Sequence, residues 1–419
     1  MLPTALRRSL LCSAVFALTF AIGCASPRRP ADGLTVREVT PAFLESIDAR
    51  DPAVAADAHG RVALTYVTRD TTGARELWLA VSRDSGTTFS APVRVNDILG
   101  SVSSYPEGRP AAVFGPAGAL VITWSARRPG VDRAVDIASR ASSDGGVTLG
   151  PVAYLNDDRA SGIAAFHGFA AVAFRPDGAL FAAWLDERDY ATADGEPAGS
   201  SLYKSLSYDG GQSWTANERM RDTVCACCRP MIATDAVGGI ALAYRSAYLN
   251  LRDPALAISN DGGATFAVDT VLHADQWYLP GCPDVGPAVT WNQTSGGHYA
   301  WFTGAGTPGV YLTSWRSDGA SGGMKRSLSD SLNRATRPRM TALGETTLIG
   351  VEARPKSDTT HTVFAVRTLD PNGTLTPWTF LGGDVRDAWL AGSDSRSAFA
   401  CWIERDEARS RLRVVRLVR

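Results

Sequence analysis

The chain has 419 residues, and its 42 basic and 43 acidic side chains leave a formal net charge of −1. This balance excludes a protein that holds nucleic acid or an acidic partner through overall charge. Hydrophobic residues make up 45% of the chain, enough for a large buried core. Only Lys204, Lys325 and Lys356 are lysines, so an arginine at any single position says little about function.

The N-terminus has the pattern of an export signal. Arg7 and Arg8 precede an apolar run over residues 10–22, which is short for a membrane span. The run ends in Ala21-Ile22-Gly23-Cys24, which resembles a bacterial lipobox. We therefore expect residues 1–24 to be a lipoprotein signal peptide and Cys24 to become the lipidated first residue. Ordinary secretion with cleavage near Ala25 is the alternative.

Residues 25–33 have no hydrophobic periodicity and predict a flexible tether. Ala25, rather than Asp, follows the lipidated cysteine, which by resemblance to proteobacterial sorting favours the outer membrane. We expect a protein of the cell envelope, anchored by lipid to that membrane and facing either the periplasm or the cell surface.

Residues 34–419 repeat one pattern seven times. A short strand is followed by a glycine-containing turn and an apolar strand that often ends in an aromatic residue, at intervals of about 50–60 residues. Such a period predicts one four-stranded sheet per repeat and a single β-propeller domain. The repeats begin near Asp51, Arg109, Gly168, Arg229, Gly286, Arg337 and Arg386.

Four repeats contain the turn Ser-x-Asp-x-Gly-x-Thr/Ser followed by an aromatic residue or Leu. In this pattern the Ser and Asp oxygens accept hydrogen bonds from turn amides, Gly takes a positive φ, and the last hydrophobic side chain packs between strands. The turns are Ser82–Phe89, Ser142–Leu149, Ser207–Trp214 and Ser259–Phe266.

These turns resemble the Asp-box, or BNR repeat, of the sialidase superfamily of β-propellers. The resemblance implies an all-β fold of four-stranded blades. We favour seven blades, with six as the alternative because sialidases proper have six. The seventh repeat lacks an outer strand, and residues 34–39 are predicted to supply it and close the ring.

Arginines stand at the start of several predicted inner strands, close to the expected funnel. Sialidases use three arginines to hold the carboxylate of sialic acid, and Arg50-Asp51-Pro52 resembles the Arg-Ile-Pro that carries the first of them, with Asp in place of Ile. The resemblance implies a carboxylate clamp with paired guanidinium hydrogen bonds. The alternative is that these arginines bond carbonyls of neighbouring blades. The candidates are Arg50, Arg109, Arg229 and Arg337, with Arg386 as a further one.

Acidic residues follow several predicted second strands. A retaining glycosidase needs an acid/base carboxyl group and a nucleophile, and sialidases use an Asp and a Tyr activated by a Glu. Asp186 and Glu187 are the candidate acid/base residues, and Tyr105 with Glu107, or Tyr190, are candidates for the nucleophile pair. The alternative is that residues 186–189 form a solvated loop with local ion pairs.

An unusual cysteine cluster, Cys225-Ala226-Cys227-Cys228, precedes the fourth repeat, and Cys282 precedes the fifth. Both segments connect blades, so they are predicted to be adjacent in space. In an exported protein a disulfide between the cluster and Cys282 is expected. The alternative is a soft-metal site for copper or zinc with thiolate ligands. Cys401 alternates with Trp402 in a predicted strand and is expected to be a buried free thiol.

Trp277 and Tyr278 lie four or five residues before Cys282 and are candidates for stacking on a sugar ring. Together these features predict a monomeric, sialidase-like propeller that binds an acidic glycan or another small acidic ligand, with no cofactor required. Hydrolysis by an exo-glycosidase mechanism stays open. The alternative is a non-catalytic exported binding or scaffold propeller whose cysteine cluster is a disulfide staple or a metal site.

Overall fold

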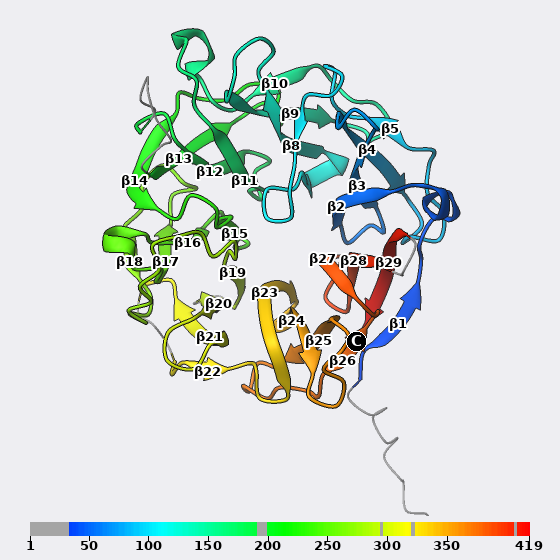
Figure 1. The fold of residues 1–419 in the computed structure, drawn as a ribbon, viewed down its shortest axis with the longest axis vertical. Helices are drawn as coiled ribbons and strands as arrows, with labels where there is room; N and C mark the ends of the chain where they lie inside the picture. Colours follow the sequence, from blue (N-terminus) through cyan, green and yellow to red (C-terminus); the bar gives the residue numbers. More distant parts are fainter. Residues whose placement is uncertain (1–32, 191–198, 294–295, 320–322, 406–408) are drawn as a thin grey trace, which may run out of the picture. The chain divides into compact units, whose positions relative to one another are not determined.

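The structure is a computed structural model that describes residues 33–190, 199–293, 296–319, 323–405 and 409–419. Its strands form seven antiparallel sheets arranged as blades around one axis (Figure 1). The predicted all-β propeller is confirmed, and the count is seven blades. The described helices are short 3-10 turns at η1 (Ala42–Ser46), η2 (Pro116–Gly118), η3 (Asp158–Ser161) and η4 (Tyr248–Asn250).

The first four blades follow one another along the chain. Blade one contains β2 (Ala49–Ala56), β3 (Val62–Arg69), β4 (Arg75–Ser82) and β5 (Val93–Arg94). Blade two contains β6 (Val102–Ser103), β7 (Ala111–Phe114), β8 (Leu120–Arg127), β9 (Val135–Ser142) and β10 (Val152–Tyr154). Blade three contains β11 (His167–Phe174), β12 (Leu180–Asp186), β13 (Ser200–Ser207) and β14 (Glu218–Val224). Blade four contains β15 (Met231–Thr234), β16 (Ile240–Arg245), β17 (Pro254–Ser259) and β18 (Val268–Val271).

The remaining three blades complete the ring. Blade five contains β19 (Ala288–Gln293), β20 (Gly296–Thr303), β21 (Gly309–Arg316) and β22 (Arg326–Ser327). Blade six contains β23 (Leu332–Leu343), β24 (Thr346–Pro355), β25 (Val363–Leu369) and β26 (Thr379–Leu381). Blade seven contains β27 (Val385–Gly392), β28 (Ser397–Arg405), β29 (Ser410–Val418) and β1 (Thr35–Glu38).

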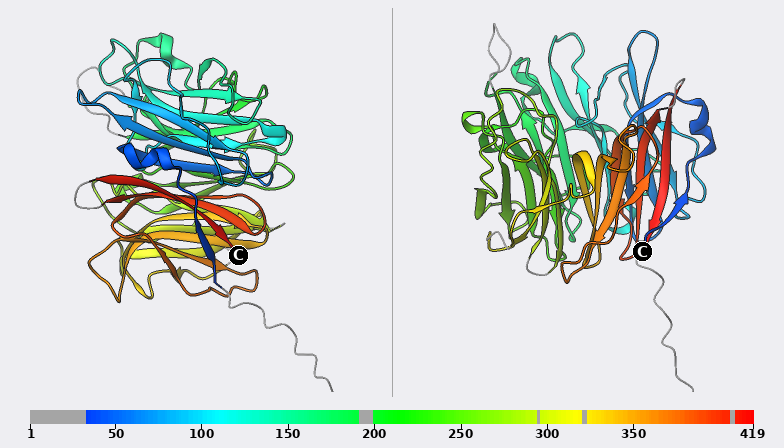
Figure 2. Two further views of the ribbon diagram at one scale, coloured as in Figure 1. Left: turned by 90° about the vertical axis from the view of Figure 1, so that its right-hand side faces the viewer. Right: turned by 60° about the horizontal axis from the view of Figure 1, so that its bottom comes forward.

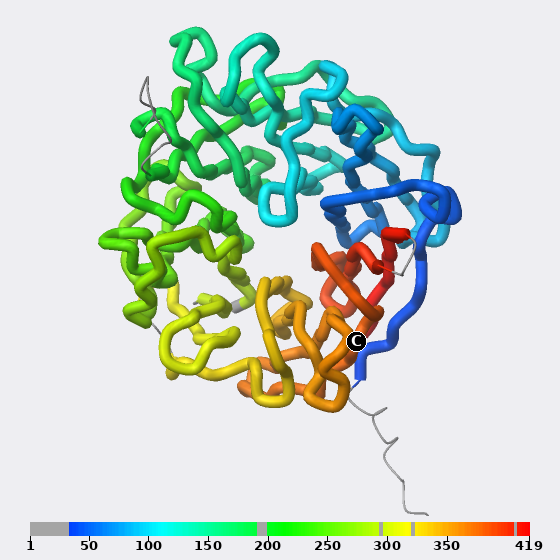
Figure 3. The backbone as a smooth tube through the Cα atoms, in the orientation of Figure 1, coloured from blue at the N-terminus to red at the C-terminus, as the bar shows by residue number. Residues whose placement is uncertain are grey.

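The N-terminal strand closes the ring, as predicted. Strand β1 pairs antiparallel with β29, from Thr35 opposite Val418 to Glu38 opposite Val415. Figure 2 and Figure 3 show the blue N-terminal segment running beside the red C-terminal strand. Pairing the two ends of the domain removes the open edge that β29 would otherwise expose.

The hydrophobic core lies between the blades. Seven clusters of buried apolar side chains are present among the described residues, and each joins two neighbouring sheets. For example, Leu64 and Tyr66 of blade one pack with Phe399 and Cys401 of blade seven. Because every blade is apolar on both faces, the middle strands are almost continuously hydrophobic and buried on both sides.

The four Ser-x-Asp-x-Gly turns share one hydrogen-bonding pattern. In the second turn, Ser142 Oγ accepts from the Gly146 amide at 2.8 Å, and Asp144 accepts from the Thr148 amide at 2.9 Å and from its hydroxyl at 2.6 Å. Gly146 has φ +90°, and a Cβ there would lie 2.8 Å from Val81. The predicted turn geometry is confirmed, and its glycine admits the neighbouring blade.

The predicted signal peptide, Cys24 and the tether up to residue 32 lie outside the described residues. Within the part of the chain that the structure describes, no helix has the length and apolar character needed to cross a bilayer.

Candidate functional site at the propeller mouth

Several inner strands begin with a bulge that turns one residue out of the ladder. The register shifts in β2, β11, β23 and β27, and at each shift a non-glycine residue has a left-handed backbone. These residues are Asp51 (φ 47°), Phe169 (φ 57°), Arg334 (φ 53°), Arg337 (φ 48°) and Asp387 (φ 57°). Such conformations cost about 1–3 kcal/mol each and are enriched at functional sites. The end of the propeller axis where these residues lie is therefore the candidate functional face.

Blade two departs from the pattern in another way. Its inner edge is divided between β6 and β7, which both pair with β8, and residues 104–110 leave the sheet between them. This excursion carries Tyr105, Glu107 and Arg109. A Cβ at Gly108 would lie 2.4 Å from the Tyr105 ring, so the close packing of this segment requires glycine.

Arg109 and Arg229 are buried, and their guanidinium groups bond backbone carbonyls. Arg109 donates to Pro106 O, Pro52 O and Asp387 O at 2.7–2.8 Å. Arg229 donates to Glu107 O at 2.8 Å and also to Arg109 O. Burial, followed by the charge of Arg109, lowers the pKa of Arg229 to about 9. These contacts agree with the alternative interpretation, in which the inner-strand arginines bond carbonyls of neighbouring blades.

Trp389 lies between these arginines. The guanidinium carbons of Arg109, Arg229 and Arg339 are 5.1, 5.6 and 4.9 Å from the Trp389 ring. The structure therefore does bring arginines from different blades together around an indole, and Arg229 and Trp389 line a cavity of about 410 Å³ between the inner strands.

Arg337 is the inner-strand arginine that reaches the mouth, where four carboxylates surround it. Its guanidinium nitrogens lie 3.6 Å from Glu107, 3.3 Å from Asp284, 3.4 Å from Glu352 and 3.9 Å from Asp387. We call these five residues the mouth cluster. The Arg337 side chain is 22% exposed and that of Asp284 is 41% exposed, so solvent reaches the cluster through them.

The carboxylates of the mouth cluster are in different electrostatic states. Burial raises the pKa of Glu107, but Arg339 and Arg109 outweigh it and the net shift is downward. Burial raises the pKa of Glu352, with Arg337 opposing. Burial and the charge of Glu107 raise the pKa of Asp284. A carboxyl group with a raised pKa beside one with a lowered pKa is the combination that general acid catalysis uses.

Two buried polar atoms, one of them in the mouth cluster, have no hydrogen-bond partner among the described residues. Glu107 Oε1 accepts from Arg339 Nη2 at 2.6 Å, while Glu107 Oε2 accepts from nothing. Arg109 Nη2 likewise has no acceptor. Buried polar groups are nearly always satisfied, so an unpaired acceptor and donor here indicate a place for water or a ligand group.

Tyr105 lies beside the mouth cluster. Its ring packs edge-on against Phe169, with centroids 5.2 Å apart. Burial raises the pKa of the phenol, Arg229 lowers it, and the nearby charges of Asp284 and Glu187 raise it further. The charge of Glu187, a candidate acid/base residue, therefore acts on the phenol of Tyr105, a candidate nucleophile.

Asp186 is not in a solvated loop. Its side chain is fully buried and accepts hydrogen bonds from Trp184 Nε1 at 2.8 Å and from Arg188 at 3.0 Å. His167 Nε2 lies 3.1 Å from Asp158 and 3.4 Å from Asp186. These contacts fix the end of β12 inside blade three, so the solvated-loop interpretation fails for Asp186, although Arg188 forms a local ion pair with it at 2.9 Å and Asp189 is exposed. Its neighbour Glu187 is half-buried and lies closer to the mouth.

Arg50 belongs to a different part of the same face. A cavity of about 670 Å³ lies between blades seven and one, and Arg50 pairs there with Asp48 at 2.8 Å. We call it the arginine basin. It adjoins the mouth cluster through consecutive residues, because Arg50 precedes Asp51 and Arg386 precedes Asp387. Its charged lining comprises Arg50, Arg386, Arg405, Arg409 and Arg411 with Glu45 and Asp48.

The cysteines lie on the other side of the mouth cluster. Cys227 and Cys282 form a disulfide with their Cα atoms 6.2 Å apart, while Cys225 and Cys228 are buried free thiols. Cys401 is a buried free thiol, as expected.

In the segment before Cys282, Trp277 packs against Phe302 and under Arg245, whereas Tyr278 is 62% exposed. Of the aromatic pair, Tyr278 therefore presents the larger surface for stacking.

The sequence analysis missed Asp284, Asp387 and Trp389. Asp387 and Trp389 follow Arg386 at a recognised repeat start, and Asp284 follows the Cys282 segment, so their positions near the axis were visible. Their roles could not be predicted, because each role depends on a left-handed residue or a bulge that no sequence pattern marks.

No protein-family model and no curated protein sequence matches this chain. Among solved structures, the Hadza microbial sialidase Hz136 superposes with a TM-score of 0.54 at 13% identity, over 92% of this chain and 68% of that one. The polysaccharide lyase Uly1 gives 0.53 at 12% identity, over 87% and 89%. A protein of unknown function from Dyadobacter fermentans DSM 18053 gives 0.51 at 15% identity, over 92% and 99%. The predicted resemblance to sialidase-type propellers is confirmed at the level of the fold.

Arg229→Ala is expected to destabilise the protein. The substitution removes two buried hydrogen bonds from a charged group and leaves two carbonyls unsatisfied, which costs about 3 kcal/mol of unfolding free energy. Urea unfolding measures the loss. Arg50→Ala, at a half-exposed ion pair, should change the same quantity by less than about 0.5 kcal/mol. Equal effects of the two substitutions would contradict the structural role of Arg229.

The buried His167 predicts a pH dependence of stability. Burial alone would lower the pKa of His167, but the hydrogen bond to Asp158 and the charges of Asp186 and Asp158 raise it. A raised histidine pKa contributes stability that is complete below the unfolded value of about 6.5 and is lost as pH rises through the folded value. His167→Asn should remove this part of the decline in unfolding free energy, whereas the exposed His59→Asn should retain it.

Proposed function

We propose that this protein binds acidic glycans at the propeller mouth and cleaves them there. The observation that carries the proposal is the position of the mouth cluster directly beside the arginine basin. Among the residues that the structure describes, five arginines and two acidic residues line the basin, which suits the carboxylate or sulfate groups of an acidic polysaccharide. The sialidase and the polysaccharide lyase with the same fold act on glycans by name, which supports the substrate class.

In this proposal Arg50 and Arg386 hold the acidic group of a sugar, and Arg337 holds the sugar at the mouth. Asp284 is the proton donor, because it is exposed and its pKa is raised. Tyr105 with Glu187 is the candidate nucleophile pair, in line with the Tyr and Glu of the family that the sequence resembles. Exposed Tyr278 extends the binding face with an aromatic surface.

A non-catalytic binding propeller is the second candidate. The observation that favours it is the burial of Arg109 and Arg229, which leaves Arg337 without the two partner arginines of a sialidase clamp. Binding at the arginine basin does not require these two residues, so binding and cleavage can be tested separately.

Arg50→Ala and Arg386→Ala should each weaken binding of an acidic oligosaccharide about tenfold, which corresponds to the loss of one charge-assisted contact of about 1.4 kcal/mol. Calorimetry with uronate-containing oligosaccharides and a sialoside measures the affinity. Arg316→Ala makes the same charge change beside the turn that follows β21, on the opposite face, and should leave the affinity unchanged. Equal affinity in all three variants would place the ligand elsewhere.

Tyr105→Phe separates cleavage from binding. The substitution keeps the packing on Phe169 and removes only the phenol oxygen, so turnover of the bound glycan should fall at least about a hundredfold while affinity is kept.

In the unsubstituted protein, turnover should decline as pH rises through the raised pKa of Asp284, because the proton donor is then lost. Binding without turnover in every variant would establish the non-catalytic alternative.

A further inference from the structure

Four cysteines meet where the connection before blade four contacts the connection before blade five. Cys225 Sγ lies 3.8 Å from Cys227 Sγ, which is bonded to Cys282 Sγ. The sulfurs of Cys225, Cys227 and Cys228 all lie within 4.8 Å of one another. A dithiol and a disulfide are thus in direct contact, and Cys225 and Cys228 have the Cys-x-x-Cys spacing.

We propose that Cys225, Cys227, Cys228 and Cys282 form a thiol–disulfide exchange site in which the Cys225 thiolate attacks Cys227. The Cys225–Cys227 bond forms, the Cys227–Cys282 bond breaks, and Cys282 leaves as a thiolate that takes up a proton. Cys228 then attacks Cys225, forming Cys225–Cys228 and releasing Cys227, which is protonated in turn. Two electrons pass from one cysteine pair to the other, so no external oxidant or reductant is needed.

The surroundings of Cys225 favour its role as the nucleophile. The hydrogen bond from Cys228 lowers the pKa of Cys225 to about 7 against the effect of burial, with help from the charges of Arg245 and Arg252. Burial and the neighbouring Cys225 raise the pKa of Cys228. A thiol whose pKa is near ambient pH is the most effective attacking group. Cys401 provides the contrast within the same chain, because burial raises its pKa to about 12.

The leaving cysteine is favourably placed as well. Cys282 is exposed to solvent, so its thiolate can be hydrated as it departs, whereas Cys225 and Cys228 are buried. The exchange would therefore move the disulfide from a surface-exposed position to the buried Cys225–Cys228 pair.

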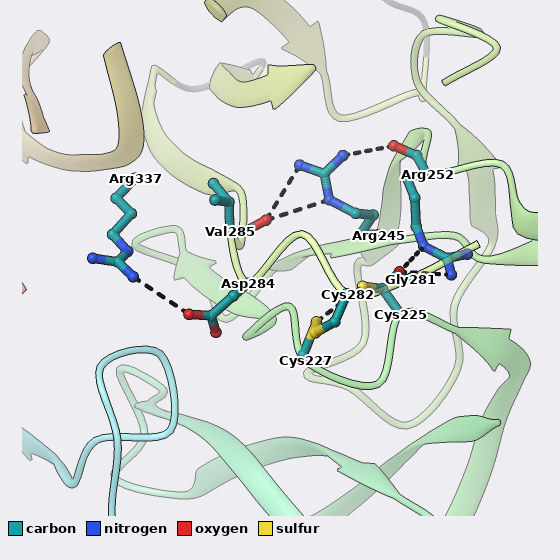
Figure 4. Close-up of a disulfide and its surroundings, with 9 residues drawn as sticks. All are labelled: Cys225, Cys227, Arg245, Arg252, Gly281, Cys282, Asp284, Val285 and Arg337. Atoms are coloured by element: carbon teal, nitrogen blue, oxygen red, sulfur yellow. Dashed lines mark hydrogen bonds and ion pairs between the residues drawn. A yellow bond between two sulfur atoms is a disulfide. The ribbon is translucent and has the colours of Figure 1, made fainter. Parts of the chain in front are cut away.

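The exchange changes how the loop over residues 281–285 is held. Arg252 donates to Gly281 O at 3.1 Å, Arg245 donates to Val285 O at 3.3 Å, and the disulfide holds Cys282 between them (Figure 4). Asp284, in the same loop, pairs with Arg337 of the mouth cluster. Breaking the disulfide removes the covalent anchor of this loop. The exchange is independent of the proposed function, whereas an effect on ligand binding would rest on it.

Disulfide mapping of the purified chain tests the exchange. The protein is held without oxygen, reductant or metal between about pH 6 and pH 8, quenched in acid, alkylated and digested for mass spectrometry. We expect two isomers, one with Cys227–Cys282 and one with Cys225–Cys228. The rate of their interconversion should rise about tenfold over this range, because the thiolate fraction of Cys225 rises with pH. Hydrogen exchange at residues 279–285 should be faster in the second isomer.

Three variants make the result decisive. Cys225→Ser should retain only Cys227–Cys282, and Cys228→Ser should accumulate Cys225–Cys227 with Cys282 alkylated, while Cys401→Ser should behave like the unsubstituted protein. Circular dichroism confirms that each variant is folded. Cys227–Cys282 as the single pairing in the unsubstituted protein and in Cys228→Ser at every pH would overturn the proposal. So would interconversion that persists in Cys225→Ser, or a dithiol that binds added zinc or copper and never exchanges.

Discussion

The inner strands converge on one axis, and buried backbone carbonyls near the starts of those in blades one, two and seven need hydrogen-bond donors. Buried guanidinium groups resolve this constraint. Arg109 alone bonds carbonyls from blades one and seven and from its own excursion, and Arg229 bonds two more. An unsatisfied buried carbonyl costs about as much as a lost hydrogen bond, so these arginines stabilise the ring.

The packing of three guanidinium groups around Trp389 has an electrostatic consequence. Three buried positive charges need compensation, and Glu107 supplies part of it by accepting a hydrogen bond from Arg339 at 2.6 Å. Arg337 lies nearer to solvent than the arginines around Trp389, and it faces Glu107, Asp284, Glu352 and Asp387. The mouth cluster is thus the solvent-facing part of a charge network, and the buried part of that network, around Trp389, stabilises the fold. Within the mouth cluster, burial raises the pKa values of Glu352 and Asp284.

The loop that carries Asp284 joins this network to the cysteines. Its position depends on one disulfide, on two arginines that bond its carbonyls, and on the ion pair with Arg337. Arg245 and Arg252 hold the loop and also lower the pKa of the Cys225 thiol. The same two charges therefore serve the geometry of the mouth and the chemistry of the thiols.

The sequence by itself determined the seven-bladed fold, the hydrogen-bonded turns and the closure of the ring by the N-terminal strand. These features depend on local turn chemistry and on a repeat period, which are legible along the chain. It also placed the two cysteine segments side by side. Only the tertiary structure separated Arg337, which lies inside β23, from Arg109 and Arg229, which precede β7 and β15. A bulge and a left-handed backbone at residue 337 turn its side chain toward the carboxylates of the mouth. The burial of these side chains and the charges around them depend on several blades at once, so no local sequence pattern predicts them.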